Sequence, residues 1–352
     1  MEFVHKGAIG TLKISEAELY VDNESRRRSG HMSHAMIEYA PGKVIAFNSN
    51  CAYDRAGGHS AFGWIEYRYS EDGGRTWSEI HELPYSKQVL LEGVNTISIE
   101  KAVFQDSVIT CFALRNTQQR VVSCEPFDTP MVIQSYDLGK TWETPYEFSP
   151  FKGRIYDAKI KDGVIYVIET CDEDFLTEVK GPRYRLFTSR DNGKSFQEES
   201  IINIESYKRG YGALLFRPDG SLIAYACYHL DSYFLDAAIS HDNGKTWERL
   251  PAIPLKYGIR NVQIAKLADG YVMHGRAWIN GLWGQGQIIY TSKDGIEWDD
   301  GILLDPYKNS CYYSNMITLQ DKDGKDYILL QYSDLYTDDA QVNVMHRFLQ
   351  LE

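Results

Sequence analysis

The chain has 352 residues, of which 43% are hydrophobic and 13% aromatic, so it can bury a substantial core. Its formal net charge of −12 argues against a nucleic-acid-binding surface, because phosphate binding requires concentrated Lys and Arg. Helical periodicity is scarce, whereas 25 Tyr, 14 Phe and 7 Trp favour strands, so the composition predicts one large all-β domain.

The N-terminal stretch MEFVHKGAIGTLKI lacks a basic region followed by an apolar region, so we expect no signal peptide and a soluble, cytoplasmic protein. No apolar run reaches the ~18 residues of a membrane span. No motif calls for a nucleotide, flavin or metal, so we expect no cofactor. The widely spaced cysteines are expected to be buried free thiols: Cys51, Cys111, Cys124, Cys171, Cys227 and Cys311.

One eight-residue pattern recurs along the chain and is clearest as SHDNGKTW from Ser240. Copies begin at Ser70, Ser135 and Ser189, and a shorter copy begins at Ser292. Asp and Gly suit a tight turn, and the Trp or Phe that follows anchors the next strand. A period of about 50 residues indicates a repeat architecture in which each copy joins two strands.

These copies resemble the Asp-box, or bacterial neuraminidase repeat, of the sialidase superfamily. The resemblance implies a six-bladed β-propeller of four-stranded antiparallel blades. It also implies that the boxes lie on the outer rim, far from the substrate, and therefore serve the scaffold.

Taken in chain order, strand and turn signals predict six blades, each with an inner pair of strands followed by an outer pair. The expected blades span approximately residues 31–85, 94–148, 154–203, 209–252, 260–304 and 311–350. The last blade has no box and only one strand after its inner pair. We expect an N-terminal strand within residues 8–20, centred on Gly10–Ile14, to complete it and remove an exposed sheet edge.

Inner strands of a propeller converge on its axis, so the starts of first strands and the ends of second strands should surround one pocket. Candidates at first-strand starts are His31, His34, Asn95, Asp157, Arg209, Tyr211, Arg260, Asn261, Tyr312, Tyr313 and Asn315. Candidates at second-strand ends are Asn48, Asp54, Arg55, Arg115, Glu169, Tyr228, His229, His274, Arg276, Gln331 and Ser333.

The resemblance can be followed residue by residue. The segment from His31 to Met36 aligns with the sialidase motif Phe/Tyr-Arg-Ile-Pro-Ala-Leu, and the arginine that binds the sialic-acid carboxylate falls on Met32. Blade four also lacks the family's Glu and Arg positions. Two positions do match: Asp54 corresponds to the general acid, and Tyr313, in a Tyr-Ser-x-Met sequence, corresponds to the nucleophile. The resemblance therefore implies a divergent relative.

Three functions remain open, and an exo-acting glycoside hydrolase on an oligosaccharide is the first. Its nucleophile would be Tyr313 or a carboxylate, since Tyr nucleophiles are an accepted exception to the two-carboxylate rule. The candidate catalytic residues are Asp54, Tyr313, His34, His31, Glu100, Asp157 and Glu169. The candidate substrate-binding residues are Arg55, Arg115, Arg209, Tyr211, His229, Arg260, Asn261, His274, Arg276, Asn315 and Gln331.

The second function is a lyase that cleaves next to a uronic acid by β-elimination, for which His, Arg and Tyr side chains supply base, carboxylate neutralisation and acid. His31, His34, His274, Arg260, Arg276 and Tyr313 fit those roles. The third is a non-catalytic glycan-binding propeller with aromatic platforms such as Trp64, Trp278 and Trp283. In each case the expected partner is a glycan, with no nucleic acid and no membrane.

Overall fold

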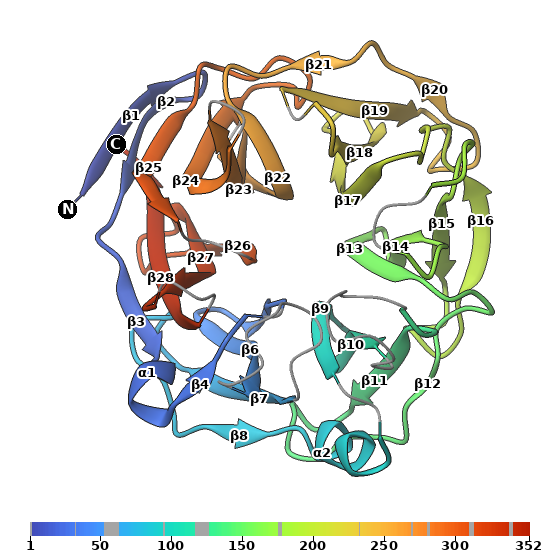
Figure 1. Cartoon of the computed structure of the whole chain (residues 1–352), viewed down its shortest axis with the longest axis vertical. Coiled ribbons are helices and arrows are strands. Elements are labelled where there is room, and N and C mark those ends of the chain that lie inside the picture. Colours follow the sequence, from blue (N-terminus) through green and yellow to red (C-terminus); the bar gives the residue numbers. More distant parts are fainter. Residues whose placement is uncertain are drawn as a thin grey trace.

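The computed structural model describes residues 2–31, 33–52, 63–93, 96–116, 127–174, 178–231, 233–268, 270–279, 282–309, 313–337 and 341–352. The described strands form six antiparallel sheets arranged as blades around a central axis (Figure 1). The all-β, six-bladed propeller predicted from the repeats is therefore confirmed.

The first five blades follow one another along the chain. Blade one contains β4 (Arg28–Ser29), β5 (Ala35–Ala40), β6 (Lys43–Ala52), β7 (Gly63–Ser70) and β8 (His81–Glu82). Blade two contains β9 (Thr96–Gln105), β10 (Val108–Asn116), β11 (Met131–Ser135) and β12 (Tyr146–Glu147). Blade three contains β13 (Arg154–Lys161), β14 (Val164–Thr170), β15 (Tyr184–Ser189) and β16 (Gln197–Ile201). Blade four contains β17 (Arg209–Phe216), β18 (Leu222–Tyr228), β19 (Phe234–Ser240), β20 (Glu248–Arg249) and β21 (Ile253–Pro254). Blade five contains β22 (Gly258–Leu267), β23 (Gly270–Ile279), β24 (Leu282–Ser292) and β25 (Ile302–Asn309).

Blade six joins the two ends of the chain. Its C-terminal strands are β26 (Ser314–Gln320), β27 (Asp326–Leu335) and β28 (Val342–Leu351). β2 (Gly10–Ile14) pairs with the end of β28, and β1 (Phe3–Gly7) pairs with β2. β3 (Glu18–Val21) pairs with the first half of β28. The predicted closure by an N-terminal strand is confirmed, and both termini lie together at this blade (Figure 1).

Among the described residues, two short helices interrupt the strands, and neither was predicted. In α1 (Asn23–Arg26) the side chain of Asp22 caps the N-terminus by accepting from the backbone of Ser25 at 3.0 Å. α2 (Pro84–Leu91) has a proline in its first turn, and its Ser86 hydroxyl accepts from the backbone of Ile65 in β7 at 3.0 Å. Within the described ranges, neither helix is long or apolar enough to cross a bilayer.

Each box closes its own turn between two outer strands. In the box from Ser240, the Ser240 hydroxyl donates to Asp242 at 2.7 Å and accepts from the Gly244 N–H at 2.8 Å. Asp242 in turn accepts from the Thr246 N–H at 2.9 Å and from the Thr246 hydroxyl at 2.7 Å, which holds the remainder of the box. The boxes from Ser70, Ser135 and Ser189 repeat this arrangement. The prediction that the boxes are strand-turn-strand joints is confirmed.

The boxes also tie each blade to the one before it. The box carbonyl of Gly139 in blade two accepts from the Tyr67 hydroxyl of blade one at 3.0 Å. Likewise, Gly73 accepts from Tyr327 of blade six at 3.0 Å, and Gly295 accepts from Tyr225 of blade four at 2.6 Å. The repeated sequence therefore fixes both a turn and an interblade contact.

The core lies between neighbouring blades. One continuous cluster of buried apolar side chains, which includes Tyr184, Tyr225 and Met273, joins blades three, four and five. Cys51, Cys111, Cys171 and Cys227 are buried free thiols, as expected, whereas Cys124 and Cys311 lie outside the described residues.

Candidate active site

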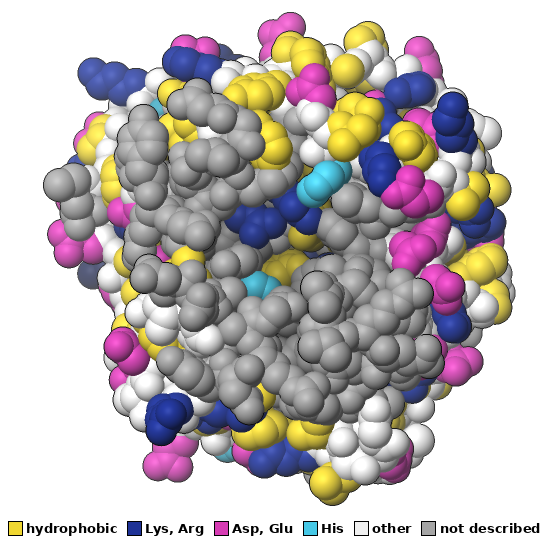
Figure 2. All heavy atoms as spheres, in the orientation of Figure 1, with side chains coloured by type: hydrophobic (Ala, Val, Ile, Leu, Met, Phe, Trp, Pro, Cys, Tyr) yellow, Lys and Arg dark blue, Asp and Glu magenta, His cyan; other side chains and the backbone are white. Residues whose placement is uncertain are grey.

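A small cavity lies on the axis where the first strands of the blades begin. It is lined by residues of all six blades: Ser33, His34, Glu100, Arg154, Tyr156, Tyr211, Gly212, Asn261, Val262, Gln263, Tyr313 and Ser314. Figure 2 shows the face above it, where Lys or Arg and His side chains lie in a central hollow. The convergence expected from propeller geometry brings these residues together.

Bulges in the inner strands aim several of these side chains at the axis. The pairing register shifts at Glu100 in β9, at Tyr156 in β13, at Tyr211 in β17 and after Arg260 in β22. A bulge adds one residue to a strand and re-aims its side chain. Tyr211 and Asn261 also adopt positive φ values of 61° and 60°, which non-glycine residues rarely do outside functional or tightly constrained sites.

An ion pair between Glu100 and Arg154 spans blades two and three inside the cavity. The Arg154 Nε donates to one Glu100 oxygen at 3.0 Å, and Nη2 lies 2.9 Å from the same oxygen. Ser33 of blade one donates to the other oxygen at 2.6 Å and accepts from Arg154 at 2.9 Å. Arg154 is only 1% exposed, so this pair is shielded from bulk solvent and its charges interact strongly.

Tyr313 lies against this ion pair at the start of blade six. The guanidinium carbon of Arg154 is 5.2 Å from the Tyr313 ring centroid, within cation–π range. His31 contacts the same ring edge-on, with centroids 6.0 Å apart, and Tyr211 lies 6.4 Å away. Of the three candidate nucleophilic carboxylates, only Glu100 lines the cavity with Tyr313.

Two arginines face each other beside the cavity. Arg260 in β22 is directly opposite Arg276 in β23, and the Arg260 guanidinium stacks over Tyr211 at 5.2 Å. Burial and the charge of Arg276 lower the pKa of His31 to about 3. Burial and the charges of Arg260, Lys208 and Arg276 lower the pKa of His229 to about 4. Both histidines are therefore neutral at pH 7, and the arginines provide a site suited to a carboxylate.

His34 and His274 are also held neutral, but by contacts between blades. His34 Nε2 lies 2.7 Å from the Ser333 hydroxyl, and burial, followed by the nearby His31, lowers the pKa of His34 to about 3. His274 lies 2.9 Å from the Ser314 hydroxyl and 3.1 Å from Gln287 Oε1, and burial lowers its pKa to about 4.

Several predicted site residues are placed in the scaffold around the cavity. Asp157 accepts from the backbone of Ala158 and Leu214 at 2.9 Å each. Asn315 accepts from the Met36 N–H at 3.1 Å, and Gln331 donates to the Phe47 carbonyl at 3.3 Å, so both join blade six to blade one. Their contact with substrate stays a prediction.

Three other candidates lie away from the cavity lining. Glu169 accepts from Ser149 at 3.2 Å, and burial raises its pKa to about 8. Arg115 pairs with Asp128 at 3.0 Å, and Arg209 pairs with Asp236 at 2.7 Å. The ring of Trp64, one of the proposed platforms, contacts Arg28 and Lys87, each 4.5 Å from its centroid. Asp54, Arg55, Asn95, Tyr312, Met32 and the side chain of Trp283 lie outside the described residues.

Arg154 is the main site residue that the sequence reasoning missed, together with Ser33 and Tyr156. Arg154 is the first residue of the first strand of blade three, so the strand-start criterion applied to the other blades would have found it. Nothing in the sequence indicated the bulge that turns Tyr156 toward the axis.

Known proteins similar to this chain agree with this fold. A family model described as BNR/Asp-box repeat matches residues 68–79 and 238–249. No curated protein matches the chain by sequence. A crystal structure of a protein of unknown function from Dyadobacter fermentans superposes with a TM-score of 0.74 at 14% identity, covering 97% of this chain and 99% of that one.

Sialidases are also among the similar structures. The intramolecular trans-sialidase from Ruminococcus gnavus, in complex with oseltamivir carboxylate, has a TM-score of 0.62 at 13% identity and covers 95% of this chain and 97% of its own. Trypanosoma rangeli sialidase, solved as a covalent intermediate with 2,3-difluorosialic acid, has a TM-score of 0.61 at 14% identity over 92% of this chain. The chain spans only 54% of that sialidase. The chain thus carries Asp-box repeats and has a sialidase-like fold.

Proposed function

We propose that this chain is an exo-acting, retaining glycoside hydrolase that removes a terminal, carboxylate-bearing sugar from an oligosaccharide. The observation that carries the proposal is the meeting of Tyr313, Arg154 and Glu100 in one axial cavity beside Arg260 and Arg276. The sialidase-like fold supports glycosidic chemistry, and the arginine pair supports an acidic sugar.

In the proposed reaction the Tyr313 oxygen attacks the anomeric carbon while the glycosidic oxygen leaves with a proton. A phenol is a poor nucleophile unless a base or cation favours its anionic form. We assign Glu100 as the acceptor of the phenol proton and Arg154 as the adjacent positive charge. Asp54 is assigned by resemblance as the acid that protonates the leaving oxygen. Water then cleaves the tyrosyl–sugar bond and regenerates the phenol.

The substrate would place its carboxylate between Arg260 and Arg276, which are opposite each other across β22 and β23. A bidentate arginine contact fixes both the position and the orientation of a carboxylate. His31 and His229 are neutral beside them and can donate or accept hydrogen bonds to sugar hydroxyls without adding charge.

The experiment is a trapping assay with fluorinated glycosyl fluorides, which form slowly hydrolysed glycosyl-enzyme intermediates. One set of probes carries a carboxylate and a matched set is neutral. The expected result is a mass gain of one glycosyl unit with the acidic probes, mapped to Tyr313 by peptide analysis and absent in Tyr313→Phe. A gain on Glu100, or none with any probe, would overturn the assignment of Tyr313.

Product analysis on natural oligosaccharides separates the alternatives. Hydrolysis adds water to the products, whereas β-elimination conserves mass and creates an unsaturated uronic acid with new ultraviolet absorbance. Mass-neutral cleavage would replace the proposed hydrolase by the lyase. Saturable glycan binding without any product would identify the chain as a binding protein.

A further inference from the structure

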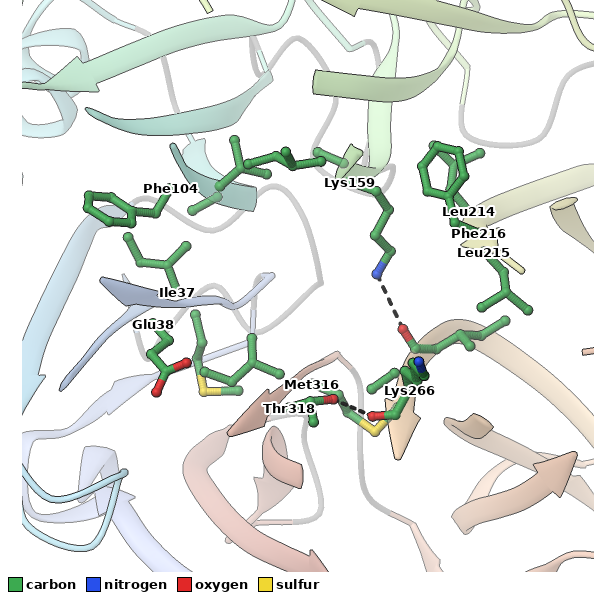
Figure 3. Close-up of a pocket in the computed structure, with 18 of the residues that line it drawn as sticks. Ile37, Glu38, Phe104, Lys159, Leu214, Leu215, Phe216, Lys266, Met316 and Thr318 are labelled. Atoms are coloured by element: carbon green, nitrogen blue, oxygen red, sulfur yellow. Dashed lines mark hydrogen bonds between the residues drawn. The ribbon is translucent and has the colours of Figure 1, made fainter. Parts of the chain in front are cut away.

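A second cavity, of about 410 Å³, lies at the opposite end of the axis from the candidate active site. We call it the lower cavity, and the cavity of the candidate active site the upper cavity. All six inner strands line it, with residues such as Ile37, Val103, Ile160, Leu215 and Met316. Figure 3 looks into this end, and the order of the blades runs in the opposite sense to Figure 1. The volume is within the usual range of small-molecule sites, about 300–1,000 Å³.

A polar layer separates the two cavities. Lys101 and Lys159 both lie 3.5 Å from Asp157, one at each of its carboxylate oxygens. Lys101 also donates to Gln263, which lines the upper cavity. The layer follows Glu100 and Tyr156 by one residue along their strands, so it forms the floor of one cavity and the roof of the other.

The charges of this layer do not balance among the described residues. Glu100 and Arg154 neutralise each other above it, whereas Asp157 alone faces two lysines. Lys101 is 8% exposed, so one excess positive charge lies close to a low-dielectric interior, where an anion would be strongly attracted.

Lys159 brings that charge into the lower cavity. In Figure 3 its side chain extends across the open space toward blade five, and its amino group donates to the Ile264 carbonyl at 3.3 Å. An ammonium group has three donors. The contacts to Ile264 and Asp157 use two of them, which leaves one to meet a ligand from the open side.

We propose that the lower cavity is a second ligand site that binds a small amphiphilic carboxylate, with its carboxylate on Lys159 and its apolar body along Ile37, Leu215 and Met316. Apolar walls with one charged group at the closed end match such a molecule better than a fully hydrated anion or a free sugar. The lining of the lower cavity also contains Glu38, whose carboxylate accepts from the Gly42 N–H at 2.8 Å, and a second lysine, Lys266.

The experiment uses octanoate as the probe and methyl NMR of the full chain with labelled methionine methyl groups. Met36 and Met316 line the cavity, whereas the buried Met131 and Met273 do not, so the chain contains its own internal control. We expect the Met36 and Met316 signals to shift saturably with octanoate while those of Met131 and Met273 stay in place. No saturable shift at millimolar octanoate would overturn the proposal, as would equal shifts at all four methionines.

The role of Lys159 is tested by substitution. In Lys159→Met we expect octanoate affinity to fall at least about tenfold, the usual loss for a charge-assisted hydrogen bond. Lys140→Met, at an exposed position in a box, is the matched control and should bind normally. Octanol, which lacks the charge, should bind the wild type and Lys159→Met equally. Unchanged octanoate affinity in Lys159→Met would overturn the assignment, and Lys159→Gln provides the same test if the first variant does not fold. None of these readouts depends on glycosidase activity.

Discussion

At the scale of single residues, the phenol of Tyr313 is the group whose chemistry decides the proposed reaction. Tyr313→Phe removes one oxygen and keeps the ring contacts with Arg154 and His31. We expect turnover to fall by ~10²-fold or more because the nucleophile is lost. Initial rates on a cleaved oligosaccharide measure this.

The matched control for that substitution is Tyr39→Phe, which removes an exposed hydroxyl that donates to Glu71 at 3.1 Å, outside the candidate active site. It should leave the rate unchanged. Normal turnover in Tyr313→Phe would remove Tyr313 from the mechanism, provided that both variants melt at the wild-type temperature.

The ion pair of Glu100 and Arg154 should matter for stability as well as for activity. Glu100→Gln leaves the guanidinium of Arg154 buried without its counter-charge, which typically costs about 3–5 kcal/mol. Denaturant unfolding measures the loss. The exposed pair of Lys152 and Glu173, at 3.3 Å, is the control, since Glu173→Gln should change stability by less than about 1 kcal/mol. Equal small effects of both substitutions would show that the buried pair is not charged.

At the scale of elements, the boxes hold each outer pair of strands, and we expect them to have no catalytic role. Asp242→Ala removes the acceptor for Ser240, Thr246 and Lys245 in a turn between β19 and β20. We expect the free energy of unfolding to decrease, because the hydrogen bonds that hold the turn closed are lost. The kinetic constants of the folded protein should not change.

Asp242→Asn is the graded control for the box, because an amide keeps one acceptor oxygen for the turn. It should destabilise less than Asp242→Ala. A loss of activity without a loss of stability in either variant would contradict the scaffold role of the boxes.

At the scale of the whole molecule, contacts between blade six and its two neighbouring blades close the propeller. A buried histidine lies at each of these two interfaces. His34 contacts Ser333 of blade six, and His274 contacts Ser314 of blade six. Burial lowers the pKa of these histidines to about 3 and about 4. The unfolded chain takes up protons near pH 6.5, whereas the folded chain does not until the lower values are reached.

The free energy of unfolding should therefore be highest above about pH 6.5 and should decrease as the pH falls toward 4. At pH 5 we expect a loss of up to about 2 kcal/mol for each of these histidines. Unfolding free energies at pH 7 and pH 5 measure it, and His274→Gln should show a smaller difference between the two. An equal difference in both proteins would assign the acid sensitivity to other groups.

The architecture could be predicted from the residue pattern of the chain. The recurring boxes required a strand-turn-strand unit at regular spacing, and a last blade without a box implied that the N-terminal strand completes it. Those inferences succeeded because turn chemistry and strand alternation are local properties, written within a few neighbouring residues such as Ser240, Asp242 and Gly244.

Which polar residues share a cavity depends on how the blades pack together, and could not be predicted from the sequence. Arg154 meets Glu100 and Ser33 across three blades, while Asp157 and Asn315, equally plausible from sequence, are used to join blades. The side chains of Glu100, Tyr156 and Tyr211 reach the axis through bulges that no local pattern announces. The physical reason is that a one-residue shift in strand register exchanges the two faces of a strand, and that shift is set by packing between blades.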